Sequence, residues 1–202
     1  MLDAALGQCR AWHDSGLPVS VAVNLAERDL ADSRLEDEVA EALRRWKLDP
    51  STLELEIPES AVMTDPERVQ KMLNRLSRRG VRLAIDDFGS GYASLSHLKE
   101  LPVDVLKIDK SFVQNMDTND EDDAIVRSTI ELAHSLGLRV VAEGVESEDI
   151  LERLGALGCD LAQGYCLSRP LPAEELSASL GSAARREVGA RKSRKRSKSL
   201  VA

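Results

Sequence analysis

The chain has 202 residues and a mass of 22.1 kDa, which is enough to bury the core of one or two domains. Its composition, 43% hydrophobic and 31% charged, is that of a globular protein, and no apolar run is long enough to span a bilayer. The net charge of −8 argues against nucleic-acid binding by the body of the chain.

The cysteine content and the N-terminal residues bear on location. Cys9, Cys159 and Cys166 have neither metal-site nor redox-motif spacing, so we expect small buried side chains in a reduced compartment. The N-terminal residues do not have the pattern of a secretory signal. A cytoplasmic protein without a transmembrane segment is therefore expected.

The predicted elements alternate between helices and strands. Apolar residues at helical spacing predict helices, and β-branched apolar runs predict strands. The strands expected in chain order are 19–25, 53–57, 81–86, 103–109, 138–146 and 159–165. The expected helices are 2–13, 35–46, one opening at Thr64, 93–100, one opening at Thr118 and one that contains 150–154. Both threonines precede an acid at capping-box spacing, Glu67 and Glu121.

About six strand-then-helix units in a row imply parallel strands joined by right-handed crossovers. This α/β pattern is typical of an open doubly wound sheet or of a (β/α) barrel. Polar residues at the carboxyl ends of successive strands favour the barrel, because there they converge on one mouth, whereas an open sheet strings them along an edge. These residues are Asn24, Glu56, Asp86, Lys107, Glu143 and Gln163.

The last part of the chain differs in composition. Residues 185–202 hold eight Lys or Arg and one acid, and they lack apolar periodicity. We therefore predict a domain over residues 1–180 and a basic, disordered tail over 181–202. The alternative is a tail that contacts nucleic acid or anionic lipid.

The polar strand ends indicate a chemistry. Carboxylate and amide oxygens suit hard divalent cations such as Mg²⁺ or Mn²⁺, and the lack of histidine at these strand ends argues against zinc. Adjacent Asp86 and Asp87 would let one carboxylate bridge two cations, an arrangement that clamps both oxygens of a phosphoryl displacement. Lys107 could orient the attacking water or help to deprotonate it. The alternative is a structural polar network that fills the end of a barrel.

Several segments resemble one family, the EAL-domain phosphodiesterases that hydrolyse the bacterial messenger cyclic di-GMP. The matching segments are VAVNLAERDL (21–30), LELEIPES (53–60), AIDDFGSGYASLSHLKELPVDVLKIDKSFV (84–113), VVAEGVES (140–147) and AQGYCLSRPLP (162–172). The resemblance implies a (β/α)8 TIM-like barrel of the EAL type, of which about six of the eight strands are present here. It also implies hydrolysis of one phosphodiester of cyclic di-GMP, which gives linear pGpG.

The resemblance further implies roles for single residues. Two Mg²⁺ or Mn²⁺ ions would be held by Asn24, Glu56, Asp86, Asp87 and Glu143, with Asp86 as the bridging ligand. Lys107 and Gln163 are similar to the residues that hold the attacking water beside the catalytic Glu143. Glu59 resembles the acid that anchors the loop after Asp87. Asp109 and Glu146 resemble residues that support the site or face guanine. The expected partners are a second copy in a homodimer, or an upstream sensor or GGDEF-type domain in a longer parent protein.

One departure from the family is large. The Glu-Ala-Leu segment of the family lies on a strand before the first helix found here, and another strand precedes it. We therefore expect two strands, one metal ligand and a substrate-binding Arg to be missing, which would leave unpaired strand edges at 19–25 and 159–163. Three hypotheses follow. They are a cyclic di-GMP phosphodiesterase, a non-catalytic module that binds the nucleotide or a protein, and a barrel phosphodiesterase with another substrate.

Overall fold

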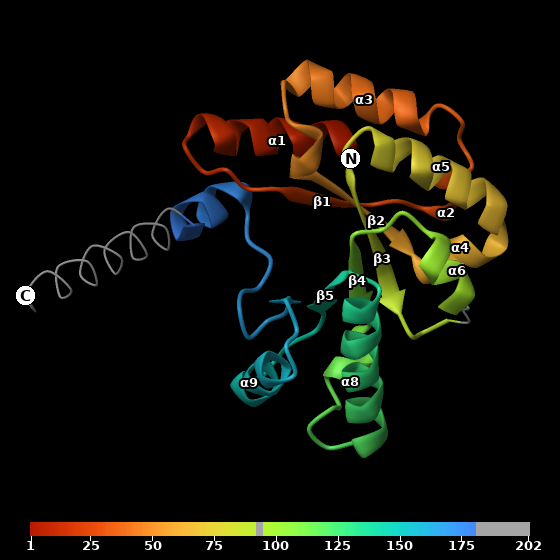
Figure 1. The fold of residues 1–202 in the computed structure, drawn as a ribbon. Coiled ribbons are helices and arrows are strands. Elements are labelled where there is room, and N and C mark those ends of the chain that lie inside the picture. Colours follow the sequence, from red (N-terminus) through yellow and green to blue (C-terminus); the bar gives the residue numbers. More distant parts are fainter. Residues whose placement is uncertain (92–94, 181–202) are drawn as a thin grey trace, which may run out of the picture.

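Six parallel strands form one curled sheet in the order β1-β2-β3-β4-β5-β6 in a computed structural model that describes residues 1–91 and 95–180 (Figure 1). The strands are β1 (Val21–Asn24), β2 (Leu53–Pro58), β3 (Arg82–Phe88), β4 (Val105–Ile108), β5 (Arg139–Ala142) and β6 (Leu161–Ala162). Neighbours in sequence are neighbours in the sheet, as in a barrel wall. The α/β class and the half-barrel of six strands are thus confirmed. The predicted tail, 181–202, lies outside the described residues.

Helices follow the strands along the chain (Figure 1). They are α1 (Leu2–Asp14), α2 (Glu27–Leu30), α3 (Leu35–Trp46), η1 (Pro50–Thr52), α4 (Glu59–Thr64), α5 (Pro66–Arg78), α6 (Leu95–Glu100), α7 (Lys110–Val113), α8 (Asp120–Ser135) and α9 (Glu148–Ala156), and residues 173–180 are also helical. Over the described ranges, none of them is long and apolar enough to cross a membrane.

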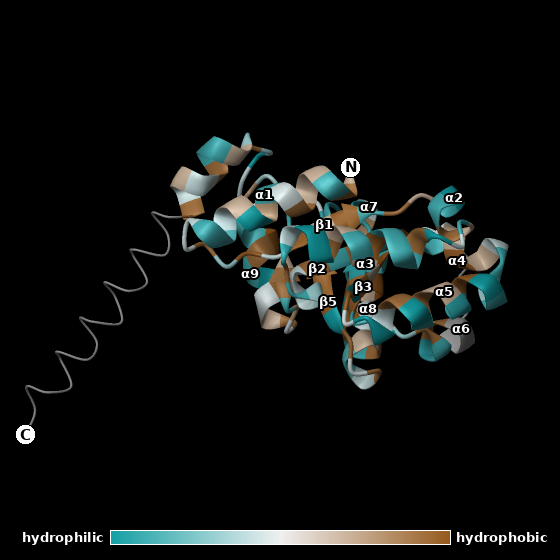
Figure 2. Ribbon diagram, turned by 90° about the horizontal axis from the view of Figure 1, so that it is seen from above, coloured by the Kyte–Doolittle hydropathy of each residue, from teal (hydrophilic) through white to brown (hydrophobic). Residues whose placement is uncertain are grey.

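The main core lies between the outer face of the sheet and these helices. Leu55, Leu83 and Leu106, from three neighbouring strands, are fully buried there. Figure 2 shows apolar residues along the strands and polar residues on the exposed sides of the helices. Burial of this apolar surface stabilises the layered arrangement and holds the strands in register.

The inner face of the sheet has a much smaller apolar cluster, made of Ala84, Val105 and Val141. Side chains two residues apart along a strand share a face. Asp86 and Lys107 lie two residues beyond Ala84 and Val105 and therefore share this inner face. Glu143 follows Val141 by the same step, just past the end of β5. The strand pattern thus aims three charged side chains into the concave side of the sheet.

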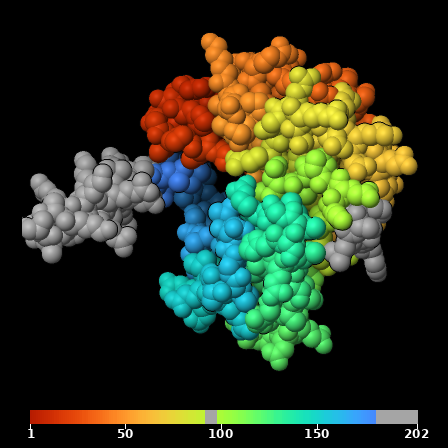
Figure 3. Space-filling model, in the orientation of Figure 1, coloured from red at the N-terminus to blue at the C-terminus, as the bar shows by residue number. Residues whose placement is uncertain are grey.

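The described sheet has two edges, and the two terminal helical segments of the described chain are in contact. Within the described ranges, β1 and β6 are the edges of the sheet, as predicted for 19–25 and 159–163. The C-terminal helical residues return to α1, where the Trp12 indole N–H donates to the Ser177 hydroxyl at 2.7 Å. In Figure 3 the blue C-terminal segment accordingly lies against the red N-terminal one.

Some local predictions were wrong. Helix α5 is capped by Asp65, whose carboxylate accepts from the Arg68 N–H at 3.2 Å, because Thr64 is already the last residue of α4. Helix α8 is capped by Asn119, which accepts from the Glu121 N–H at 2.9 Å. Short Asp and Asn side chains reach the first free N–H groups as readily as threonine does.

The cysteine prediction is confirmed in part. Cys9 is buried, whereas Cys159 and Cys166 are only half-buried, because both lie beside the β6 edge of the sheet. All three thiols are free.

Candidate metal centre

Lys107 lies at the centre of the inner face, enclosed by three carboxylates. Its ammonium Nζ is 2.8 Å from Glu56 Oε1, 2.8 Å from Asp86 Oδ1 and 2.7 Å from Glu143 Oε1. The lysine is 3% exposed, and Glu56 and Asp86 are 7% and 9% exposed. The three acids come from β2, β3 and the end of β5, so the sheet itself sets their spacing.

The electrostatics of this cluster are unbalanced. Burial by itself would lower the Lys107 pKa, but the hydrogen bonds that its ammonium donates to Asp86, Glu143 and Glu56 outweigh this effect and raise the pKa above its ordinary value. One ammonium cannot neutralise three carboxylates. Burial accordingly raises the pKa of Glu143 despite the opposing contact with Lys107. The inner face has an excess of negative charge.

A second group of acids adjoins the first. One carboxylate oxygen from each of Asp86, Asp87 and Glu143 lies within 4.8 Å of the others, a spacing at which these residues could hold a metal ion. Oxygen ligands of this kind fit Mg²⁺, Mn²⁺ or Ca²⁺. Burial raises the pKa of Asp87, with smaller contributions from the charges of Asp86 and Asp109. Asp86 and Glu143 thus belong to both groups.

The backbone at Asp87 is strained. Its φ of 55° lies in the left-handed region, which non-glycine residues rarely adopt. Successive side chains of a regular strand point to opposite faces, so this turn of the backbone lets two adjacent acids serve one site. Strain of this kind persists where the surrounding structure holds it in place.

Glu59 provides such support. It is the first residue of α4 and is 3% exposed. Its Oε2 accepts from the Gly89 N–H at 2.8 Å and from the Gly91 N–H at 3.4 Å. These contacts have the geometry that the predicted loop-anchoring role requires.

The other predicted site residues surround the cluster. Asn24 ends β1 in register with Glu56 and therefore shares its face. Gln163 directly follows β6, and its N–H donates to the Ala142 carbonyl at 2.8 Å. Asp109 caps α7 by accepting from the Ser111 N–H at 2.7 Å, and although burial opposes it, hydrogen bonding from Ser111 lowers the Asp109 pKa. Their roles in binding stay predictions.

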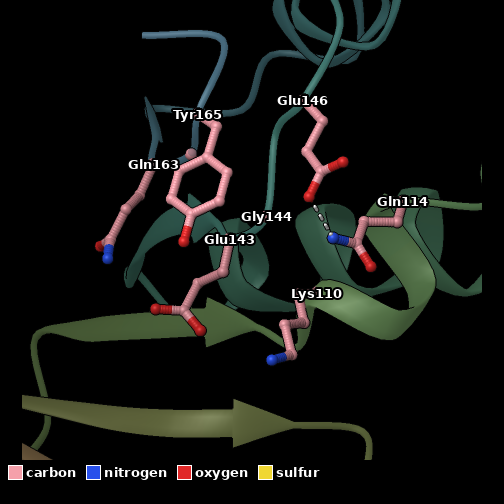
Figure 4. Close-up of a pocket in the computed structure, with 8 residues that line it drawn as sticks. Lys110, Gln114, Glu143, Gly144, Glu146, Gln163 and Tyr165 are labelled. Carbon is pink, nitrogen blue, oxygen red and sulfur yellow. Dashed lines mark hydrogen bonds between the residues drawn. The ribbon is translucent and has the colours of Figure 1, made fainter. Parts of the chain in front are cut away.

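A pocket of about 350 Å³ opens beside Glu143 (Figure 4). It is lined by Glu143, Gln163 and Glu146, which the sequence singled out, and by Lys110, Gln114 and Tyr165, which it did not. Gln114 donates to Glu146 across the pocket at 2.8 Å. The sequence held weak indications of the residues that were missed. Lys110 and Gln114 are four residues apart, which places them on one face of a helical turn, and Tyr165 comes two residues after Gln163.

Two glycines set the shape of this pocket. A Cβ on Gly164 would lie 2.2 Å from the Val145 carbonyl oxygen, so only glycine lets the loops after β5 and β6 meet. Gly144 has a φ of +70°, and a Cβ there would lie 2.5 Å from the Lys110 Cβ. Together they fix the position of Gln163 relative to Glu143.

Comparison with known proteins gives the family. The model of the EAL domain matches residues 1–170, so the chain belongs to the EAL domain family. The bifunctional diguanylate cyclase/cyclic di-GMP phosphodiesterase MucR of Pseudomonas aeruginosa is 45% identical over 181 residues, which cover 89% of this chain and 26% of MucR. The chain thus spans about a quarter of the length of that relative.

Solved structures of EAL-domain proteins resemble this fold. The PaMucR phosphodiesterase in complex with c-di-GMP aligns with a TM-score of 0.84 at 45% identity, covering 87% of this chain and 71% of that one. The calcium and cyclic di-GMP complex of Klebsiella pneumoniae BlrP1 aligns with a TM-score of 0.76 at 31% identity, covering 83% of this chain and 42% of that one. The fold is that of EAL-domain structures.

Proposed function

We propose that the chain carries the catalytic residues of a metal-dependent phosphodiesterase that converts cyclic di-GMP to linear pGpG. The observation that carries the proposal is the acid cluster of Asp86, Asp87 and Glu143, which lies beside a buried lysine and of which Glu143 also lines a pocket. Family membership supports it, as do the similar structures that are complexes with cyclic di-GMP and, in one case, with calcium as well.

Divalent ions, Mg²⁺ or Mn²⁺, would be held by Asp86, Asp87 and Glu143 together with Asn24 and Glu56. When bound, they would stabilise the negative charge that develops on the phosphoryl group. Carboxylates on β2, on β3 and just after β5 offer oxygen ligands for such ions, and Asp86 would be the ligand common to both.

The residues of the chain would position the reaction. Lys107 and Gln163 orient a water molecule towards phosphorus. The water loses a proton as its oxygen forms a bond to phosphorus, the bond from phosphorus to the ribose 3′ oxygen breaks, and the 3′ oxygen takes up a proton. One ring ester is thereby opened. The Gln114–Glu146 pair and Tyr165 line the pocket in which the rest of the nucleotide would lie.

Incubation of the purified chain with cyclic di-GMP and Mn²⁺, followed by chromatography of the products, tests this proposal. We expect pGpG, and no turnover when EDTA replaces Mn²⁺. Binding of cyclic di-GMP without pGpG would contradict the enzymatic proposal and support the non-catalytic module. Turnover of other cyclic dinucleotides in preference to cyclic di-GMP would contradict the substrate. The predicted homodimer, the upstream domain and the cytoplasmic location stay predictions.

A further inference from the structure

The ammonium of Lys107 occupies a position suited to a cation. Its Nζ lies within 2.8 Å of one oxygen from each of three carboxylates, those of Glu56, Asp86 and Glu143. The side chain of the lysine is 4% exposed, and those of the three acids are between 9% and 16% exposed. Carboxylates removed from water in this way need a nearby positive charge.

The cluster offers two cation positions rather than one. The first is the position of Nζ, between Glu56, Asp86 and Glu143. The second is defined by oxygens of Asp86, Asp87 and Glu143, and Lys107 has no ion pair with Asp87 among the described contacts. Asp86 and Glu143 are common to both positions, whereas Glu56 belongs to the first and Asp87 to the second.

We infer that Lys107 acts as an internal stand-in for one of the two divalent ions, and this rests on the proposed function. Without metal, the ammonium occupies the position beside Glu56 and leaves the position beside Asp87 open. The first ion therefore binds beside Asp87 without displacing any cation. The second ion competes with Lys107 for Glu56 and binds more weakly. Lys107 thus sets the order in which the two positions fill.

Titration of the metal-free chain with Mn²⁺ tests this inference, with calorimetry for affinity and electron paramagnetic resonance for the number of bound ions. The variants are Lys107→Met, which keeps a long apolar side chain, and Lys71→Met as a matched control. Lys71 lies on the surface of α5, with a side chain that is 79% exposed. We expect one tight and one weaker site in the wild type and in Lys71→Met.

In Lys107→Met the weaker site should tighten by at least about 10-fold, the scale on which neighbouring groups change metal affinity. The melting temperature of this variant should fall in EDTA and recover in Mn²⁺, because three buried carboxylates then depend on metal for their positive charge. A variant that folds only when Mn²⁺ is present would also support the inference.

Other results would overturn it. These are identical Mn²⁺ affinities in Lys107→Met and wild type, absence of Mn²⁺ binding in both, and a variant that stays unfolded with and without Mn²⁺. The proposed function is judged separately by pGpG formation in the wild type. Turnover with unchanged affinities would refute only the stand-in role, and tightened Mn²⁺ binding without turnover would refute only the enzymatic proposal.

Discussion

Two buried ion clusters in this protein have opposite compositions. In the outer helical layer, one acid, Glu36 of α3, accepts from Arg75 Nε on α5 and, at 2.7 Å, from Nε of Arg79, which directly follows α5. On the inner face, one base, Lys107, is held by three acids. The arginine side chains are 43% and 48% exposed, so water solvates their excess charge. The acids around Lys107 have little such access.

The difference in charge balance distinguishes a structural contact from a candidate binding site. The Glu36 cluster has an excess of positive charge that solvent accommodates, and it joins two helices. The Lys107 cluster has an excess of negative charge that the described residues leave unneutralised. A protein tolerates such an excess of buried negative charge where a bound cation neutralises it. The inner cluster is therefore the one whose properties should depend on metal.

The largest effect is expected for Asp86→Asn, which keeps the shape of the side chain and removes a charge common to both cation positions. Hydrolysis of cyclic di-GMP should fall by more than about 100-fold, beyond the loss typical of residues that only support metal ligands. Product chromatography at saturating Mn²⁺ measures it. Asp104→Asn serves as a control for an Asp outside the cluster, and a fully active Asp86→Asn variant would remove the distinction between the clusters.

A smaller loss is expected for Glu59→Ala. Its carboxylate accepts from the N–H groups of Gly89 and Gly91, so its removal should loosen the loop that follows Asp87. We expect about a 10-fold lower turnover, as for residues that orient metal ligands. Glu59→Gln retains an acceptor oxygen and should recover part of the activity. If both variants lost the same amount of turnover, hydrogen bonding of Glu59 to the loop would not explain the loss.

Glu36→Gln should change stability and leave hydrolysis unaltered. Loss of charged hydrogen bonds should cost about 1–3 kcal/mol in the free energy of unfolding. Arg79 and Arg75 lower the Glu36 pKa against the effect of burial. This stabilisation is present above the unfolded-state pKa of about 4.3 and is lost as pH falls through the lower folded-state pKa. The difference from wild type in urea titrations should therefore shrink on acidification, and a constant difference would contradict this explanation.

Glu143→Gln should change stability in the opposite direction in the metal-free chain, raising the free energy of unfolding at pH 7. Burial raises the Glu143 pKa, so its charge costs stability above the raised folded-state pKa and costs nothing below the unfolded-state value of about 4.3. The variant in EDTA should melt slightly higher than wild type at pH 7 and at the same temperature near pH 3. A lower melting temperature at pH 7 would show that the inner acids are already balanced.

The sequence allowed the parallel strand order and most of the inner acids to be predicted. Strand and helix patterns alternate strictly, and Asp86, Lys107 and Glu143 stand at or near the carboxyl ends of strands, which the fold brings together. Local pattern is informative here because each polar residue interrupts an apolar run.

Other features depend on contacts that no local pattern contains. The position of Lys107 between three acids is set by the register of four strands. The left-handed backbone at Asp87 is unusual for its residue type, and the loop that follows is held by Glu59, 30 residues before Gly89 in the sequence. Tyr165 follows Gly164, where the loops after β5 and β6 meet, and Lys110, the first residue of α7, packs against Gly144. Asp65 and Asn119 cap their helices in place of the nearby threonines.

The most direct test of the central claim is anomalous diffraction from crystals of the chain grown with Mn²⁺. We expect manganese peaks in contact with the carboxylates of Asp86, Asp87 and Glu143, and loss of these peaks in Asp86→Asn crystals. Manganese bound only elsewhere, or an inner face without any peak at saturating Mn²⁺, would contradict it.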